Sequence, residues 1–208
     1  MIANRIFWLG IIGASLFIVT ALIGGFMIAD YSHIENLISE SYAIDTEYGF
    51  QLRFYGFIPS SIALTLFGLL ALRIFPKSNL TNWGFLGFAL FYGLGTLIVS
   101  LFPCDAGCNK TFIHPSLSQV IHNISGGLTY LIVPLCLIFI GLGSKNWANS
   151  TRFSNISLTL GGIALLFVFI FFNNYEDDFI GLYQRIIEGC ILVWVIYCSF
   201  FLKNYKTS

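Results

Sequence analysis

Long apolar stretches alternate with short polar ones along the whole chain of 208 residues. Six of these stretches stay apolar for about 20 residues, the length that an α-helix needs to cross roughly 30 Å of hydrocarbon. They cover approximately residues 6–29, 54–75, 83–102, 116–142, 156–172 and 179–202. The pattern predicts an all-α, polytopic membrane protein, with six transmembrane helices in one bundle and a single domain over residues 1–208.

Composition agrees with this fold class. Hydrophobic residues make up 57% of the chain and charged residues only 10%, whereas soluble domains carry about 25% charged residues. The apolar part of residues 6–29 is longer than the 7–15 residues usual in a signal peptide, so we expect it to remain as the first helix. The formal net charge is zero, which argues against nucleic acid as a partner.

The distribution of charge predicts the orientation of the helices. All ten acidic residues fall on one side of the predicted spans, and seven of the ten basic residues flank the other side. These seven are Arg5, Arg73, Lys77, Lys145, Arg152, Lys203 and Lys206. Because cytoplasmic loops are enriched in lysine and arginine, we expect both termini to be cytoplasmic, in a plasma or inner membrane, with residues 30–53 and the cysteine-containing loop outside.

Cys104 and Cys108 lie four residues apart in that loop, with a glycine between them that permits a tight turn. An oxidising outer compartment favours a disulfide between them. Two alternatives remain, free thiols or a zinc site in which both thiolates join His114 and His122. The spacing of these four residues does not match common zinc-finger spacing, so we expect no cofactor. If zinc does bind, its candidate ligands are His114, His122 and Asp105.

The fourth apolar stretch carries a polar stripe. Ser118, His122, Ser125 and Thr129 are separated by four, three and four residues, which places them on one helix face. The adjoining pair of glycines, residues 126 and 127, allows a neighbouring backbone to approach closely. Two interpretations follow: the stripe lines a water-filled cavity, or it forms a hydrogen-bonded seam with a neighbouring helix.

The last apolar stretch contains Arg185 and Glu188, three residues apart. Arg185 lies roughly 9 Å inside the span at 1.5 Å per residue. A guanidinium at that depth needs a partner, so we expect an ion pair with Glu188, or with Asp45 or Asp105 from the outer loops. Such a pair could serve packing alone or belong to a binding site.

Polar residues open the second, fourth and sixth predicted helices on the outer side. We therefore expect one outward-facing polar cavity, which binds a membrane lipid, a small ligand or a membrane protein partner. Its expected ligand-binding residues are Arg53, Asp105, His122, Arg185 and Glu188.

Four segments resemble a known membrane family: LISES, FPCDAGC after the third span, HPSLSQVIHNISGG at the entry to the fourth, and GLYQRIIEGCILVW in the sixth. In their order and spacing they are similar to the domain of unknown function 998. The resemblance covers nearly the whole chain and implies a six-span layout. The resemblance implies that Asp105, His122 and Arg185 correspond to polar positions typical of the family, and it implies no activity.

Two other functions remain open, so the sequence does not decide whether the protein is an enzyme. The first is a membrane-embedded hydrolase of a lipid ester or amide, with or without a metal. Its catalytic candidates are His122, Asp105 and His114, assisted by Ser39 or Ser118. The second is a small-solute or proton-coupled transporter, in which the ionisable groups inside the spans form a relay, namely Arg185, Glu188 and His122.

Overall fold

The computed structural model describes residues 2–76 and 78–205. It confirms the six-helix prediction: six helices within these residues are long and apolar enough to cross a membrane, and the same residues contain no β-strand. Four of the spans are single α-helices, namely α1 (Ile2–Phe26), α6 (Leu117–Gly143), α7 (Thr151–Asn173) and α8 (Ile180–Asn204). The protein is therefore an integral membrane protein.

The second and third spans each contain a stretch of wider π-helix. The second consists of α2 (Gly49–Leu52), the π-helical η2 (Arg53–Phe57) and α3 (Ile58–Ala71). The third consists of α4 (Asn79–Gly87), the π-helical η3 (Phe88–Leu94) and α5 (Gly95–Leu101). Such turns are rare and occur often at functional sites. Both of them lie next to the cavity described below: Phe57 of η2 lines it, and Tyr92 of η3 donates a hydrogen bond to Glu188 in its lining.

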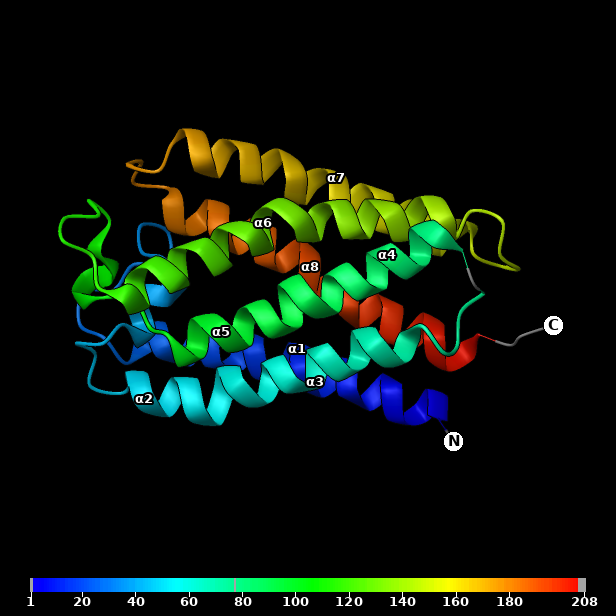
Figure 1. Ribbon diagram of the computed structural model, residues 1–208, viewed down its shortest axis with the longest axis horizontal. Coiled ribbons are helices and arrows are strands. Elements are labelled where there is room, and N and C mark those ends of the chain that lie inside the picture. Colours follow the sequence, from blue (N-terminus) through cyan, green and yellow to red (C-terminus); the bar gives the residue numbers. More distant parts are fainter. Residues whose placement is uncertain (1, 77, 206–208) are drawn as a thin grey trace.

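The six spans form a closed ring in chain order (Figure 1). Each span packs against the one before it, and α8 returns to pack against α1. Close approach is possible where a glycine faces a neighbour: a Cβ at Gly161 of α7 would lie only 3.0 Å from the carbonyl oxygen of Pro134 in α6. Both termini lie at one end of the bundle, which we call the terminal end. The opposite end, with Cys104 and Cys108, is the disulfide end.

Aromatic side chains fill the terminal half of the ring. The ring of Phe75 lies 5.4 Å from Phe85, 4.8 Å from Trp147 and 5.8 Å from Phe201, measured between centroids. The indole of the fully buried Trp194 donates a hydrogen bond to Ser157 Oγ at 2.8 Å. Packed aromatic rings of this kind leave little free volume, so this half of the bundle is densely packed.

The helix boundaries differ from the sequence prediction where charged or polar residues precede an apolar run. The second span begins at Gly49 rather than at residue 54, and the fifth begins at Thr151 rather than at residue 156. The second span tolerates Arg53 because the guanidinium donates to the carbonyl oxygen of Tyr42 at 2.7 Å. Lys77 and Lys206, which entered the charge argument, lie outside the described residues.

Candidate functional site

Residues 30–48, which join the first two spans, fold over the disulfide end of the bundle, and we call them the cover loop. Their one regular element is the 3-10 helix η1 (Ile38–Tyr42), whose residues are mostly buried. The backbone N–H of Ile38 donates to Gln184 Oε1 at 2.6 Å. Together with the bond from Arg53 to Tyr42, this contact fixes the cover loop to the second and sixth spans.

Arg185 also binds the cover loop. Its guanidinium donates to the carbonyl oxygen of Asn36 at 2.7 Å, to the Tyr31 hydroxyl at 2.6 Å and to the carbonyl oxygen of Gly181 at 3.0 Å. The expected ion pair with Glu188 is therefore wrong: carbonyl and phenol oxygens satisfy the guanidinium, and the ion pairs among the described residues do not include it. Burial raises the pKa of the Tyr31 hydroxyl, against the opposing effect of Arg185.

His33 of the cover loop has an unusual environment. Both ring nitrogens are buried, and neither has a hydrogen-bond partner among the described residues. The ring packs edge-on against Phe26 and Tyr31. Burial, and then the charge of Arg185, lower the pKa of His33.

Cys104 and Cys108 form the predicted disulfide, with their Cα atoms 4.8 Å apart. The disulfide-bonded loop lies against the cover loop. The backbone N–H of Ile44 donates to the carbonyl oxygen of Cys104 at 3.1 Å, and Lys110 Nζ pairs with Glu40 Oε1 at 2.8 Å. Disulfide formation confirms the favoured alternative, and it removes both sulfur atoms from the proposed zinc ligand set.

Asp105 supports the entry to α6 and does not line the cavity. One carboxylate oxygen accepts from the backbone N–H of Ser116 at 2.9 Å, and the Asp105 backbone N–H donates to Gln119 Oε1 at 2.7 Å. The bond from Ser116 lowers the pKa of the Asp105 carboxyl. His114 lies in the same loop, exposed and with a left-handed backbone at φ 46°.

The polar stripe on α6 is a hydrogen-bonded seam. Four of its side chains, spaced three or four residues apart along α6, contact backbone carbonyl oxygens of the third span or of the residues directly after it. The pairs are Ser118 with Pro103 at 2.6 Å, His122 with Phe102 at 2.9 Å, Ser125 with Gly95 at 3.3 Å and Thr129 with Phe91 at 2.6 Å. This result confirms the second of the two interpretations of the stripe, although two of the four residues also face the cavity.

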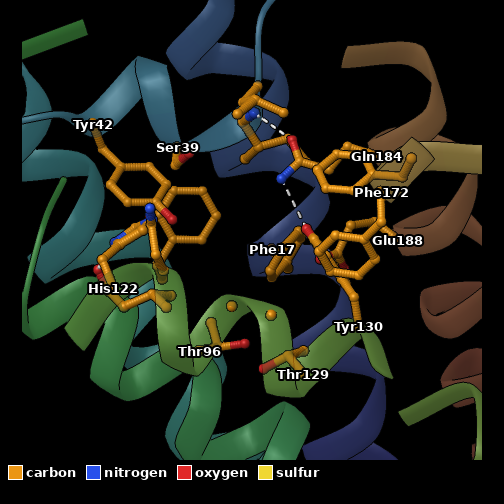
Figure 2. Close-up of a pocket in the computed structure, with 18 of the residues that line it drawn as sticks. Phe17, Ser39, Tyr42, Thr96, His122, Thr129, Tyr130, Phe172, Gln184 and Glu188 are labelled. Carbon is orange, nitrogen blue, oxygen red and sulfur yellow. Dashed lines mark hydrogen bonds between the residues drawn. The ribbon is translucent and has the colours of Figure 1, made fainter. Parts of the chain in front are cut away.

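A cavity of about 250 Å³ lies inside the ring, beneath the cover loop. Figure 2 shows Tyr42 and His122 on one side of it and Gln184, Tyr130 and Glu188 on the other. Its lining combines aromatic rings with uncharged polar groups and one carboxylate. The polar and ionisable members are Ser39, Tyr42, Thr96, His122, Asn123, Thr129, Tyr130, Tyr175, Gln184 and Glu188.

Glu188 is the carboxylate, and its side chain is only 6% exposed. Tyr92 donates to one of its oxygens at 2.7 Å and Tyr130 to the other at 3.0 Å. Gln184 in turn donates from its amide nitrogen to the Tyr130 hydroxyl at 2.8 Å. Glu188 lies eight residues into α8, about 12 Å along the helix axis at 1.5 Å per residue, so it is deep within the span.

The cavity reaches the surface on one side, between α6 and α7. These two helices pack closely near the terminal end and diverge towards the disulfide end (Figure 1). Asn123 of α6 is exposed and Phe172 of α7 is 45% exposed, yet both line the cavity. A Cβ at Gly126 or Gly127 would meet no atom within 4 Å. We call this opening the lateral mouth.

The structure therefore brings together only some of the predicted site residues. His122, Glu188 and Ser39 line the cavity, whereas Asp105, Arg185, Arg53 and His114 do not. The expectation that Asp105, His122 and Arg185 share one pocket is wrong, because Asp105 and Arg185 are engaged in holding loops. The described residues contain no cluster of three or more His, Cys, Asp or Glu side chains suited to a metal.

Sequence reasoning missed the two tyrosines that bind Glu188. Tyr92 and Tyr130 lie within apolar runs, where a tyrosine is not distinguished from a core aromatic residue. The four-residue spacing of Gln184 and Glu188 was the available signal: it indicates that both face the same way, and in the structure they meet through the Tyr130 hydroxyl.

The family model DUF998, described as a protein of unknown function, matches residues 11–200. This match confirms the resemblance noted in the sequence. No curated protein and no solved structure matches the chain.

Proposed function

This chain belongs to the DUF998 family, and because the function of that family is unknown, we propose a role from the cavity: the protein binds a membrane amphiphile there. The amphiphile places its polar group beside Glu188, Gln184 and Tyr130, and its apolar chain passes out through the lateral mouth. The observation that carries the proposal is the combination of a buried polar cluster with an opening on the side of the bundle.

The position of the mouth supports a ligand that comes from the lipid phase. Asn123 and Gly126 lie in the first three turns of α6, and Phe172 lies in the last turn of α7. Both helices are apolar enough to cross a membrane, so the mouth lies along the hydrocarbon region and near one of its edges. A ligand with an apolar chain can reach such an opening directly by diffusing in the bilayer.

The volume supports the same class of ligand. Small-molecule sites usually occupy about 300–1,000 Å³, and this cavity holds about 250 Å³. It therefore suits a polar group and the first part of a chain, with the rest of the chain in lipid. The aromatic packing around Phe75 closes the terminal half of the ring, which favours a site with one opening over the path through the membrane that a transporter needs.

Binding also accounts for the arrangement better than hydrolysis does. Ser39 and His122 line the cavity, but in the described part of the chain no hydrogen bond joins them, and the Nδ1 atom of His122 contacts the carbonyl oxygen of Phe102. Asp105, the expected orienting carboxylate, is bound to Ser116 at the loop surface. The groups that would have to act together in a hydrolase serve separate structural contacts.

The proposal is tested by placing a side chain in the mouth. Gly126→Leu adds a side chain at a position that lines the cavity and has free space around it. Gly162→Leu is the matched control, because Gly162 also has free space but is not part of the lining. We expect native mass spectrometry in a maltoside detergent to detect a retained amphiphile in the wild type and in Gly162→Leu, and to detect none in Gly126→Leu. Equal retention in all three proteins would contradict the proposal.

We also propose that the disulfide end faces the outside and that both termini are cytoplasmic. The charge distribution supports this orientation, and a disulfide in the loop at residues 104–108 suits an oxidising compartment. Reporter domains fused after Lys145 and after Lys203 should report the cytoplasm, and fusions after Glu47 and Asp177 should report the outside. The reversed pattern at two or more of these sites would contradict it.

A further inference from the structure

The hydrogen bonds around Glu188 point to the charge of the ligand. We infer that the cavity takes an organic cation, an amphiphile whose ammonium group pairs with the Glu188 carboxylate. This inference rests on the proposed function and names the ligand class for the same site.

Along the chain of hydrogen bonds from Ile38 to Glu188, the direction of each bond is fixed by the first donor, which cannot accept. The backbone N–H of Ile38 can only donate, so the amide oxygen of Gln184 must face it. The Gln184 amide nitrogen then faces Tyr130 and donates to its hydroxyl oxygen. The Tyr130 proton is left to point at Glu188. This chain, part of which is drawn in Figure 2, delivers a donor to the carboxyl group.

A second donor reaches the other carboxyl oxygen. Tyr92, which lies in the π-helical turn η3, donates to Glu188 Oε2 at 2.7 Å. A carboxyl group that accepts one bond at each oxygen is matched to its ionised form, because the neutral acid must use one oxygen as a donor. The two tyrosines therefore stabilise a negative charge about two turns inside the last helix.

The described residues supply no cation to balance this charge. No lysine, arginine or histidine nitrogen of that part of the chain forms an ion pair with Glu188. Arg185 and Arg53 are engaged by the cover loop instead. An ionised group at this depth is costly unless it is paired. An ammonium group of the ligand supplies the pairing that the protein does not.

The walls of the cavity suit a cation as well. Phe17, Tyr42 and Phe172 contribute aromatic rings to the lining, and Figure 2 shows Phe17 between the Tyr42 side and the Glu188 side. Aromatic faces attract ammonium groups, most strongly where water is excluded. An anionic head group would instead meet the Glu188 carboxylate and these negative ring faces, and would be repelled.

Three octyl probes with one chain length and different charges test the inference. Octylamine is cationic at pH 7.5, 1-octanol is neutral and octanoate is anionic. Their binding to the full chain is measured by isothermal titration calorimetry in maltoside micelles. The heat that remains with Gly126→Leu reports partition into the micelle and is subtracted. We expect octylamine to bind at least about tenfold more tightly than octanol, and octanoate more weakly than octanol.

Glu188→Gln keeps the shape of the side chain and removes the charge. In this variant we expect the ratio of octylamine to octanol affinity to fall to about one. If octanol or octanoate binds the wild type as tightly as octylamine, and Gly126→Leu abolishes that binding, the cationic ligand class is wrong while the proposed function stands. If Gly126→Leu binds all three probes as the wild type does, the proposed function itself fails. The wild-type ranking decides the question even if Glu188→Gln does not fold.

Discussion

Arg185 offers the sharpest test of the geometry, because the sequence and the structure assign it different partners. Arg185→Ala removes hydrogen bonds to the Asn36 carbonyl oxygen and to the Tyr31 hydroxyl, which tie the cover loop to α8. A hydrogen bond to a charged group contributes about 1.5–3 kcal/mol when it is buried. The guanidinium is partly exposed, so we expect a total loss of about 2–4 kcal/mol in the free energy of unfolding.

A double-mutant cycle then separates the two candidate partners. Tyr31→Phe removes only the hydroxyl, which accepts from Arg185 and donates to the Leu37 carbonyl oxygen at 2.8 Å, and it should cost about 1–2 kcal/mol. Because Arg185→Ala and Tyr31→Phe both remove the bond between Arg185 and the Tyr31 hydroxyl, the double variant should lose about 1 kcal/mol less than the sum of the two single losses. Arg185→Ala combined with Glu188→Gln should be additive within about 0.5 kcal/mol, since the two side chains make no direct contact.

The assay is reversible unfolding in maltoside micelles as sodium dodecyl sulfate is added, followed by the fluorescence of the four tryptophans, among them the buried Trp194. Arg185→Lys provides a further control, because it keeps the charge but cannot donate in the planar geometry of a guanidinium. It should recover less than half of the loss. A coupling energy with Glu188 larger than that with Tyr31 would refute the structural assignment and restore the ion pair expected from the sequence.

Three further predictions concern the loops and the helix contacts. His33→Leu should raise the free energy of unfolding, and by more at pH 5.5 than at pH 8. Burial lowers the pKa of His33 in the folded protein, so as the pH falls below about 6.5 the unfolded chain takes up a proton before the folded protein does. This difference weakens the folding of the wild type at low pH, and the leucine variant does not have it. Asp105→Asn should lower the melting temperature at pH 7. The bond from Ser116 lowers the pKa of Asp105, so it stabilises the ionised form, and the effect of the substitution should disappear as the pH falls through the folded pKa. Gly161→Ala should destabilise the protein by about 1–3 kcal/mol, since its Cβ meets a backbone oxygen at 3.0 Å. Gly162→Ala has free space around it and should stabilise the protein slightly through helix propensity. Equal effects at the two glycines in the same unfolding assay would contradict this packing.

The features that were predictable from the sequence are those that depend on residues near one another in the chain. The six spans follow from the length of each apolar run, and the bond between Cys104 and Cys108 from a short loop with a glycine. The requirement that Arg185 be satisfied was also correct. The identity of its partners was not predictable, because a carbonyl oxygen and a phenol satisfy a guanidinium as a carboxylate does, and neither carries a signal in the sequence.

The site around Glu188 depends on contacts between distant helices. Tyr92 and Tyr130 lie 96 and 58 residues away from it in the chain. Their hydroxyls converge only because the helices close into a ring, and because a π-helical turn lies at Tyr92. Hydrophobic periodicity locates each helix but does not fix its rotation against the others, so these partners could not be derived from the pattern of apolar residues.

The closed ring also determines when the site comes into existence during synthesis. Chains emerge from the ribosome N-terminus first, so α1 enters the membrane long before α8, the helix against which it packs. The contact between Gly10 of α1 and Ser199 of α8 cannot form until α8 has been inserted. Glu188 enters last of its group, when Tyr92 and Tyr130 are already in the bilayer. The costliest group to leave in lipid is thus delivered after both of its hydrogen-bond donors, and the nascent protein never has to hold that carboxylate in the membrane before they are present.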